Sequence, residues 1–327
     1  MEKKRNKLTN PWVVCILALI CTFLWGSAIP SVKTGYQMFS IRSDDTASQI
    51  LFAGYRFTLA GVLTFIISCI IEKKVRLPKK EIWGNVVILG LIQTTVQYVF
   101  FYVGLSNTTG VKGAIITASN SFFSILIAHF MIRERITRRK TIGCILGFAG
   151  VIIINLSQGG FAGGLSFTGE GFLILSCFSY GFSAVFVKTF VNKDKAFTIT
   201  AYQLLLGGVI LIAIGMGLGG EVHGFTPKSI LLLIYMAIIS SVAFSLWALL
   251  LQHNSVSRVS IYGFTNPVFG VLLSAVFLGE NAFTLQNLAA LLLVSLGIIV
   301  VNLQLPFKPK MPAKHKEPGK IEVSEGI

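Results

Sequence analysis

The segment Trp25-Gly26-Ser27-Ala28-Ile29-Pro30-Ser31-Val32-Lys33-Thr34 has a second copy in the same chain. The copy reads Tyr180-Gly181-Phe182-Ser183-Ala184-Val185-Phe186-Val187-Lys188-Thr189, so both copies keep the glycine and the Val-Lys-Thr ending. One match between apolar segments is weak evidence, because such segments draw on few residue types. The match is evidence of an internal duplication only if further matches follow it in the same order.

Three more matches do follow in order. The paired segments are Tyr55-Arg56 with Tyr202-Gln203, Glu134 with Glu280, and Gly150-Val151-Ile152-Ile153-Ile154-Asn155 with Gly297-Ile298-Ile299-Val300-Val301-Asn302. These pairs lie 146 or 147 residues apart. The opening pair lies 155 residues apart, which a longer loop after the first copy explains. Four matches in one order indicate that the chain is an internal duplication.

The composition places the duplicated unit in a membrane. Of the 327 residues, 54% are hydrophobic and 13% are charged, and the mean hydropathy is +0.75, whereas an average soluble domain has about 25% charged residues. Ten apolar runs are each long enough to cross the hydrocarbon layer as a helix. They are 12–32, 49–71, 83–105, 110–132, 140–156, 170–191, 197–219, 228–251, 257–278 and 284–303. The sequence therefore predicts an all-α polytopic membrane protein with ten transmembrane helices.

The ten runs divide into five per copy, and five is an odd number. The second copy therefore enters the membrane from the opposite side, and the two repeats are inverted. We expect a basic arm (1–11), a first repeat (12–156), a Gly-rich linker (157–169), a second repeat (170–303) and a disordered basic tail (304–327).

The net charge of +15 indicates topology rather than a nucleic-acid partner. Of the 28 Lys and Arg residues, 23 lie on one side of the predicted spans, in the arm, the tail and alternate loops. Because cytoplasmic loops carry the excess of Lys and Arg, both termini are expected in the cytoplasm. We expect a multi-pass protein of the cell (plasma) membrane, of bacterial origin.

Several motifs resemble a known family. They are Trp25-Gly26 with Pro30 closing the first helix, Tyr55-Arg56-Phe57 with Ala60, Asn266-Pro267, and Gly279-Glu280. Over about residues 12 to 303, the chain resembles the EamA-type branch of the drug/metabolite transporter superfamily. The resemblance implies ten helices, a central cavity lined by the first, third, fourth, sixth, eighth and ninth of them, and export or exchange of amino acids and related metabolites. The first repeat has Asn120-Ser121 in place of Asn-Pro, so a proline hinge is expected only in 257–278.

Asn120 and Asn266 occupy equivalent positions in the two repeats, near the centres of their spans. Inverted symmetry then places both amides near the midplane of the membrane. Polar groups at that depth face the bundle interior or a water-filled cavity, and an amide offers both donors and acceptors to a zwitterionic solute. The alternative is that each amide bonds a neighbouring helix.

Aromatic and polar stripes complete the candidate substrate site. In the span 83–105, glutamine and tyrosine side chains form adjacent stripes at i, i+4 spacing. Aromatic walls with a few polar groups suit a small-molecule pocket, although such stripes also serve packing or interfacial belts. The substrate-binding candidates are Asn120, Asn266, Gln97, Tyr98, Tyr102, Trp247, Trp25 and Tyr180.

Charged residues near the spans are mostly expected to be structural. Arg56 lies well inside a span and is expected to snorkel outward or to bond helix-end carbonyls, with binding of a substrate carboxylate as the alternative. Glu134 and Glu280 end their spans and are expected to be structural. Lys112 and Arg258 begin spans at opposite faces, where they either attract carboxylate-bearing solutes or anchor the helices.

The sequence predicts a secondary transporter that exports or exchanges amino acids or related small metabolites by alternating access. No acidic residue lies in the middle of a span, so transport is expected to be uncoupled from protons or to be exchange. The alternative is a lipid-linked-sugar flippase or a channel-like facilitator.

A membrane-embedded enzyme is disfavoured. No nucleophile, acid/base pair or metal cluster shares one depth in the membrane, and the five cysteines lie in apolar runs without a neighbouring ligand. We expect no catalytic residue, no cofactor and no metal site. The expected partners are a small-molecule substrate and the lipid bilayer, and the protein is expected to be a monomer or a homodimer.

Overall fold

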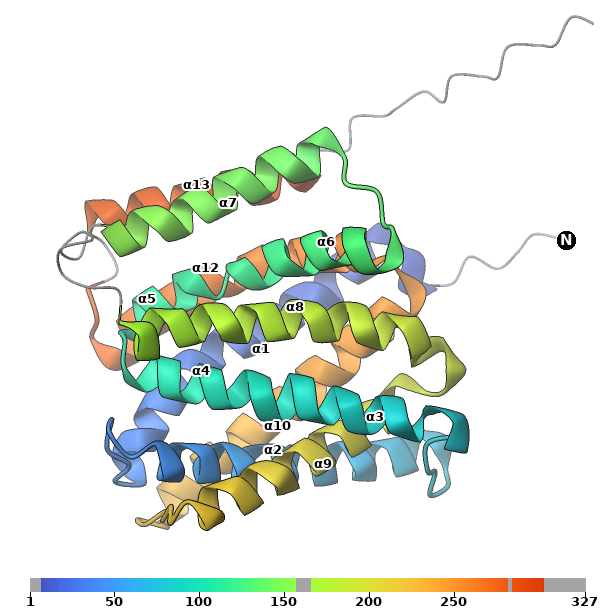
Figure 1. Ribbon diagram of the computed structural model, residues 1–327, viewed down its shortest axis with the longest axis vertical. Helices are drawn as coiled ribbons and strands as arrows, with labels where there is room; N and C mark the ends of the chain where they lie inside the picture. Colours follow the sequence, from blue (N-terminus) through green and yellow to red (C-terminus); the bar gives the residue numbers. More distant parts are fainter. Residues whose placement is uncertain (1–6, 157–165, 282–283, 303–327) are drawn as a thin grey trace, which may run out of the picture.

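The computed structural model describes residues 7–156, 166–281 and 284–302 (Figure 1). Within these residues the chain is helical and contains no β-strand. The helices are α1 (Pro11–Met38), α2 (Thr46–Glu72), α3 (Trp83–Leu89), α4 (Gln97–Ser106), α5 (Gly110–Ile116), α6 (Ser119–Ile132), α7 (Arg138–Leu156), α8 (Phe172–Phe190), α9 (Ala196–Gly217), α10 (Pro227–His253), α11 (Val256–Ser260), α12 (Thr265–Leu278) and α13 (Leu285–Asn302). A π-helical segment, Gly90–Val96, joins α3 to α4 without a break.

Eight helical segments in the described residues are long and apolar enough to cross a membrane. They are Pro11–Met38, Thr46–Glu72, Lys80–Ser106, Gly110–Ile132, Phe167–Lys193, Ala196–Gly217, Pro227–His253 and Val256–Leu278. The predicted spans 140–156 and 284–303 coincide with α7 and α13, of 19 and 18 residues. The prediction of an all-α, multi-pass membrane protein is confirmed.

The expected end of the first helix is wrong. α1 does not close at Pro30 but continues to Met38. A proline inside a transmembrane helix is tolerated where neighbouring helices pack closely against it, and Pro30 is buried in the bundle. At the end of the predicted linker, Phe167–Gly171 forms a π-helical turn. Residues 157–165 and the predicted tail lie outside the described residues.

The helices run between two faces of the molecule (Figure 1). α1 begins and α13 ends at one face, called here the terminal face, and the opposite face is called the distal face. α2 lies beside α9 and α7 beside α13, and α1 packs on α12 as α8 packs on α6. Each helix pair has an equivalent when the repeats are exchanged: the α1–α12 contact corresponds to the α8–α6 contact, and the α2–α9 and α7–α13 pairs join equivalent helices. This is expected for inverted repeats.

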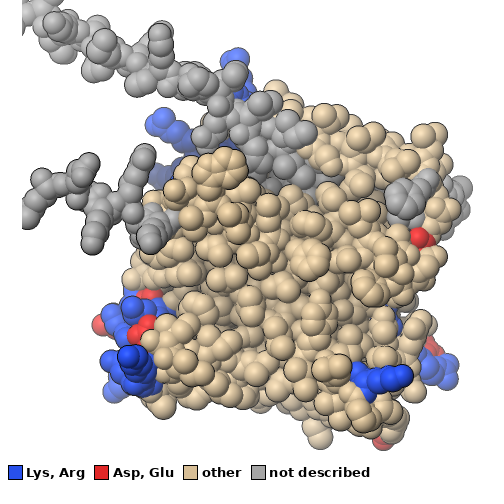
Figure 2. Space-filling view, turned by 180° about the vertical axis from the view of Figure 1, so that it is seen from behind, with Lys and Arg blue, Asp and Glu red and all other residues tan. Residues whose placement is uncertain are grey.

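On the side of the molecule seen in Figure 2, the surface between the two faces is largely uncharged. Figure 2 shows the Lys, Arg, Asp and Glu side chains gathered toward the ends of the helices, with a belt of other residues between them. Large apolar side chains such as Ile16, Phe130 and Val276 are exposed on the outside of the bundle. Such a surface suits lipid, in which helices satisfy their own backbone polar groups.

The glycine shared by the repeated segments sets how closely the helices approach. An ideal Cβ on Gly26 would lie 2.9 Å from the backbone nitrogen of Gly270 in α12. An ideal Cβ on Gly181 would lie 2.8 Å from the backbone nitrogen of Ser124 in α6. No side chain fits at either position unless the helices separate. These contacts also fix the neighbouring Trp25 and Tyr180 in the bundle interior.

Two glutamates bind helix N-termini at opposite faces. At the distal face, Glu280 accepts hydrogen bonds from the backbone N–H groups of Gly110 and Val111 at 2.8 and 2.7 Å. At the terminal face, Glu134 accepts one from the backbone N–H of Ser257 at 3.1 Å. Carboxylates satisfy the free N–H groups at a helix start and interact favourably with the helix dipole. The contacts agree with the structural role expected for both residues.

Alanine at Gly26 or Gly181 is expected to destabilise the fold. Forcing a methyl group into a closed contact costs about 1–3 kcal/mol, so the apparent melting temperature of the detergent-purified protein should fall for Gly26→Ala and Gly181→Ala. Gly84→Ala is the matched control, because no atom lies within 4 Å of its ideal Cβ. Equal melting temperatures for all three variants would contradict the close helix contacts.

Candidate functional site

Two interrupted helices meet in the middle of the bundle. α5 ends at Ile116 and α6 begins at Ser119, while α11 ends at Ser260 and α12 begins at Thr265 after a 3₁₀ turn. The two interruptions fall at equivalent positions of the repeats. Discontinuous helices near the midplane are how many secondary transporters build their substrate sites.

The interruption in the first repeat needs no proline. The sequence predicts a hinge only beside Pro267. In the first repeat, however, the backbone N–H of Asn120 donates a hydrogen bond to the Thr117 carbonyl three residues back, at 3.1 Å, instead of to the carbonyl four residues back as in an α-helix. Thr117 Oγ1 in turn donates to the Ala114 carbonyl at 2.7 Å. A threonine hydroxyl therefore competes with a backbone N–H for the Ala114 carbonyl at this position. A threonine can thus mark a helix interruption where no proline is present.

A small cavity lies beside both interruptions. In the state seen here its volume is about 40 Å³, room for about three water molecules, so a larger solute enters only when the lining side chains move apart. It is lined by Trp25, Ala28, Ile29, Arg56, Gln97, Tyr98, Phe101, Thr117, Asn120, Ser176, Tyr180, Phe244 and Asn266. The structure thus brings six of the eight sequence-predicted residues to one cavity: Asn120, Asn266, Gln97, Tyr98, Trp25 and Tyr180.

Tyr102 and Trp247 do not line this cavity. Tyr102 is fully buried, and its hydroxyl accepts a hydrogen bond from Arg56 Nη1 at 3.1 Å, so the ring lies behind the wall. Trp247 packs against Trp25, with 4.9 Å between ring centroids, and lines a separate cavity of about 10 Å³ toward the terminal face. Helical stripes predict which side of a helix is buried, but neither the depth nor the rotamer of each side chain.

Three polar atoms of cavity-lining residues have no hydrogen-bond partner. They are Trp25 Nε1, Gln97 Oε1 and Asn266 Oδ1, all of them buried. An unpaired buried polar atom is costly and in a native protein is satisfied by water or a ligand. Among the described residues, the lining residues of this cavity therefore carry one donor and two acceptors without a protein partner.

Arg56, which the sequence favours as a structural residue with binding of a substrate carboxylate as the alternative, also lines the cavity. It does not snorkel outward; its side chain points inward from α2 and is 1% exposed. Nε donates hydrogen bonds to the Met236 carbonyl at 3.2 Å and to Ser240 Oγ at 3.0 Å. The guanidinium carbon lies 4.9 Å from the ring centroid of Phe57 and 5.9 Å from that of Tyr98. The sequence signal for an inward-facing Arg56 is that it lies deep in a span, whereas the acidic residues lie outside the middle of the spans.

Aromatic rings close the cavity toward the terminal face. The Trp25 ring meets Tyr180, Phe244 and Trp247 edge-on, with centroid distances of 5.9, 5.5 and 4.9 Å. Such edge-to-face pairs stabilise by more than their buried area alone. Below them, the buried apolar side chains of α1, α8 and α10 continue to the terminal face.

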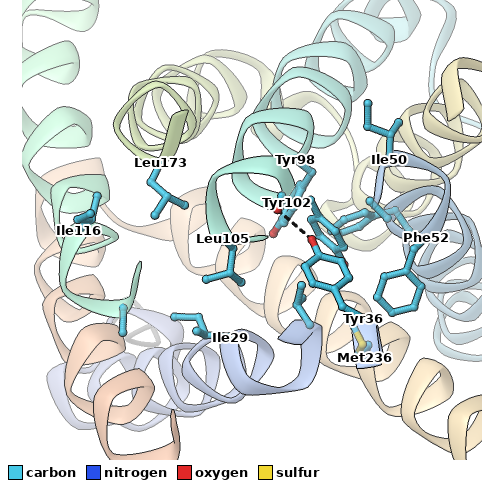
Figure 3. Packing of buried hydrophobic residues seen from close by; sticks show 14 of the residues in the cluster. Ile29, Tyr36, Ile50, Phe52, Tyr98, Tyr102, Leu105, Ile116, Leu173 and Met236 are labelled. Carbon is cyan, nitrogen blue, oxygen red and sulfur yellow. Dashed lines mark hydrogen bonds between the residues drawn. The ribbon is translucent and has the colours of Figure 1, made fainter. Parts of the chain in front are cut away.

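A larger vestibule opens on the distal side. Its volume is about 430 Å³, and its lining includes Lys33, Tyr36 and Glu280 but none of the residues around the small cavity. Figure 3 shows the packing of buried side chains around Tyr36 and Tyr102, where the Tyr36 hydroxyl donates a hydrogen bond to the Tyr102 carbonyl at 2.9 Å. Tyr36, which lines the vestibule, is thus linked through Tyr102 to Arg56, which lines the cavity.

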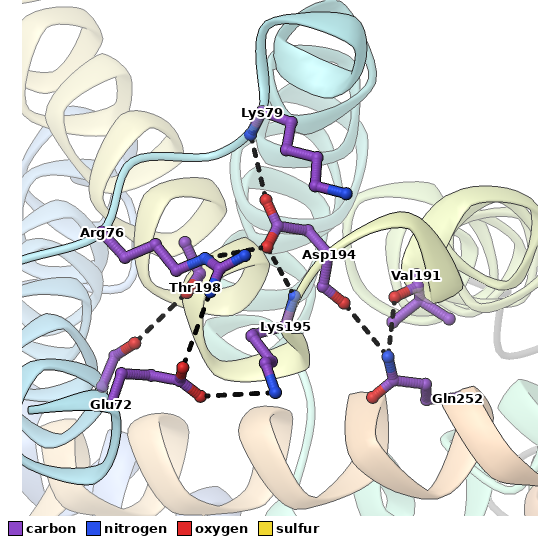
Figure 4. Close-up of polar contacts among 9 residues, drawn as sticks. Glu72, Arg76, Lys79, Val191, Asp194, Lys195, Thr198 and Gln252 are labelled. Carbon is purple, nitrogen blue, oxygen red and sulfur yellow. Dashed lines mark hydrogen bonds and ion pairs between the residues drawn. The ribbon is translucent and has the colours of Figure 1, made fainter.

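An ionic network closes the terminal face. Asp194, whose side chain is fully buried, pairs with Arg76 Nε at 3.2 Å and accepts hydrogen bonds from the backbone N–H groups of Lys79 and Lys195 at 3.0 and 2.8 Å (Figure 4). Gln252 Nε2 donates to the Val191 and Asp194 carbonyls at 3.1 Å each. The network ties together the α2–α3 loop, the α8–α9 loop and the end of α10.

The two cations that begin spans at opposite faces are already paired. Lys112 forms an ion pair with Glu170 at the distal face. Arg258 donates a hydrogen bond from Nη2 to the Thr9 carbonyl at 3.0 Å at the terminal face. These contacts favour helix anchoring over attraction of solutes.

Comparison with known proteins gives matches over almost the whole chain. The model of a family described as "EamA-like transporter family" matches residues 12–156 and again residues 167–303. An uncharacterized transporter of Archaeoglobus fulgidus is 30% identical over 299 residues, covering 89% of this chain and 98% of its own. The uncharacterized transporter YvbV of Bacillus subtilis is 29% identical over 293 residues, covering 87% and 91%. A solved crystal structure with 16% identity has a TM-score of 0.69 over 89% of this chain and 96% of its own, which shows a shared fold.

Cysteine labelling is expected to distinguish the vestibule from the cavity. In a background without the five free cysteines, Ser43→Cys in the vestibule should react with a water-soluble thiol reagent at least roughly tenfold faster than Ser176→Cys in the cavity, because thiol reactivity requires access. Ser43 is exposed, whereas Ser176 is buried. Equal rates would show that the cavity is open to the distal face.

Proposed function

Because the chain belongs to the EamA-like transporter family, we propose that it is a secondary transporter that exports or exchanges amino acids or related small metabolites by alternating access. The observation that carries the proposal is the small cavity between the two interrupted helices, where Trp25 Nε1, Gln97 Oε1 and Asn266 Oδ1 lack partners. Sites of this kind, between inverted repeats and near the midplane, bind substrates in secondary transporters.

Equivalent lysines of the two repeats support alternating access, because their contacts differ. Lys188 of α8 donates hydrogen bonds to the carbonyls of Leu251 and Asn254 at the end of α10, on the closed terminal face. Lys33 of α1, its counterpart in the repeated segment, lines the open vestibule, and no described residue accepts a hydrogen bond from its ammonium group. We call the hydrogen bonds from a lysine to the last carbonyls of a helix a lysine cap. The cap of Lys188 on α10 is thus formed in this structure, and the equivalent cap of Lys33 is not.

The first repeat contains the acceptors that Lys33 would need. Gly104 and Asn107, at the end of α4, are the counterparts of Leu251 and Asn254. A lysine bonds the free carbonyls of a helix C-terminus and interacts favourably with its dipole. In the alternate state, closure of the vestibule brings Lys33 onto α4, and opening of the terminal face releases Lys188 from α10. One cap replaces the other, so the two states have similar free energies.

The remaining features of the proposal follow from charge. No carboxylate lines the cavity among the described residues, which supports uncoupled transport or exchange rather than proton coupling. The loops of the terminal face hold most of the basic residues, so this face is cytoplasmic in a cell membrane. The repeats 12–156 and 170–303 supply equivalent helices to the contacts that change, α1 with α4 in the first and α8 with α10 in the second, and both termini lie on the cytoplasmic side.

Counterflow in proteoliposomes tests the proposal. Unlabelled amino acid inside the vesicles should accelerate saturable entry of the labelled amino acid, without strong acceleration by a pH gradient. A carrier saturates because each cycle moves one bound solute. Flux that does not saturate would identify a channel, and lipid-linked-sugar movement without amino-acid flux would identify a flippase; either result contradicts the proposal.

The same assay tests the cavity amides. Loss of a hydrogen bond to a charged group weakens binding roughly 10- to 100-fold, so Asn120→Ala and Asn266→Ala should each raise the half-saturating concentration by that order. Asn192→Ala, an exposed amide between α8 and α9, is the control. If both cavity variants kept the wild-type affinity, the amides would lie outside the substrate site.

Opposite effects are expected from the two lysines. Lys188→Gln should favour the state with a closed vestibule and slow labelling of Ser43→Cys, whereas Lys33→Gln should favour the state seen here and preserve or speed that labelling. General damage to the fold would change both rates in the same direction. Parallel changes would therefore argue against exchange of the lysine caps.

A further inference from the structure

Arg56 carries the formal charge of the cavity. Of the residues that line the cavity, all others are neutral side chains, and no carboxylate in the described part of the chain forms an ion pair with Arg56. A charge at the centre of a membrane helix costs about 2.5–3.5 kcal/mol on insertion scales. A protein keeps such a group where it has a use.

The contacts of Arg56 stabilise the guanidinium without neutralising it. Its hydrogen-bond acceptors are a carbonyl and two hydroxyls, from Met236, Ser240 and Tyr102. The faces of Phe57 and Tyr98 add cation–π attraction. All five groups are uncharged, so the full positive charge remains, and the low dielectric of the interior makes its field strong.

The guanidinium, which lines the cavity, has donors that the protein leaves unused. Nε and Nη1 hold the hydrogen bonds to the protein, whereas no described residue accepts one from Nη2. Arginine presents its N–H groups in a planar fork that matches the two oxygens of a carboxylate. An anionic group entering the cavity therefore meets a cation whose remaining donors are already oriented.

We propose that Arg56 binds the carboxylate of the transported solute and so restricts transport to solutes with one carboxylate. This inference rests on the proposed transport function and deepens it. The unpaired Gln97 Oε1 and Asn266 Oδ1 accept hydrogen bonds from an ammonium group of the same solute. The rings of Trp25 and Phe244 contact its apolar part. Together these groups recognise an α-amino acid.

The charge count excludes other classes of solute. A cation without a carboxylate is repelled by Arg56, because no acidic group in the cavity balances it. A dianion such as a phosphate monoester keeps an unbalanced negative charge, because the cavity holds one cation. A zwitterion pairs its carboxylate with Arg56 and gives its ammonium group to the neutral acceptors Gln97 Oε1 and Asn266 Oδ1, so the net charge of the cavity is the same loaded as empty.

Matched ligands test the inference on the wild-type protein. Leucine, methionine, phenylalanine and threonine are compared with their carboxamides and with the corresponding decarboxylated amines, by competition in counterflow and by thermal stabilisation of the purified protein. Because the amide keeps the shape and the ammonium group, its binding should be weaker roughly 10- to 100-fold. Equal binding of acid and amide would overturn the role of Arg56.

Variants locate the preference at one residue. Arg56→Gln should bind acid and amide about equally, and Arg56→Lys, which keeps the charge but not the fork, should retain part of the preference. Arg42→Gln removes a cation from an exposed pair with Asp44 on the distal face and should keep the full preference. If Arg56→Gln folds and still prefers the acid, the inference is wrong.

The binding and transport readouts separate the two proposals. A protein that binds the acids more tightly than the amides but shows no counterflow contradicts the transport function and supports the anion site. A protein that transports acid and amide equally well supports the transport function and contradicts the anion site. The wild-type ligand series keeps the test decisive even if Arg56→Gln fails to fold, because that comparison needs no substitution.

Discussion

The hydrocarbon layer offers no water to polar groups, and this constraint shapes the whole structure. Each helix satisfies its own backbone inside the membrane, and where the backbone departs from an α-helix, local bonds such as Asn120 N–H to the Thr117 carbonyl replace the lost ones. Groups left unpaired beside a cavity therefore stand out. Trp25 Nε1, Gln97 Oε1 and Asn266 Oδ1 are such groups, and with Arg56 they form a polar surface that only water or a solute can complete.

Inverted duplication explains the framework, and the differences between the copies give the central cavity its own chemistry. The shared glycines Gly26 and Gly181 produce equivalent helix contacts, and the two glutamates bind helix starts at opposite faces. Arg56, by contrast, has Gln203 as its counterpart, which accepts a hydrogen bond from Thr94 Oγ1 near the smaller cavity. The charge is thus a property of one repeat, and it makes the central cavity chemically asymmetric.

The sequence predicts most of the fold because a membrane-spanning helix requires a long apolar run, which can be recognised in the sequence. Apolar runs mark the spans, and the internal matches reveal the inverted repeats. The cavity was harder to predict, because helical periodicity fixes the angle of a side chain around its helix and not its contacts. Tyr102 shares a stripe with Tyr98 yet lies behind the wall. Arg56 was expected to avoid the interior, because the free-energy cost of burying its charge is evident from the sequence. The partners that offset this cost lie on α4 and α10, far away in the chain, and so could not be predicted.

Tyr102 joins the proposed anion site to the barrier below the vestibule. Its hydroxyl accepts a hydrogen bond from Arg56, and its carbonyl accepts one from Tyr36. A ligand shifts an equilibrium between two states only by binding them unequally. Closing the vestibule over an empty cavity removes a lone cation further from water, whereas closing it over a bound carboxylate buries a compensated pair, which costs less. If Arg56 binds the solute carboxylate as proposed and Gln97 and Asn266 bind its ammonium group, closure around the loaded cavity costs less than closure around the empty one, and a carrier that closes more readily when loaded than when empty is suited to exchange.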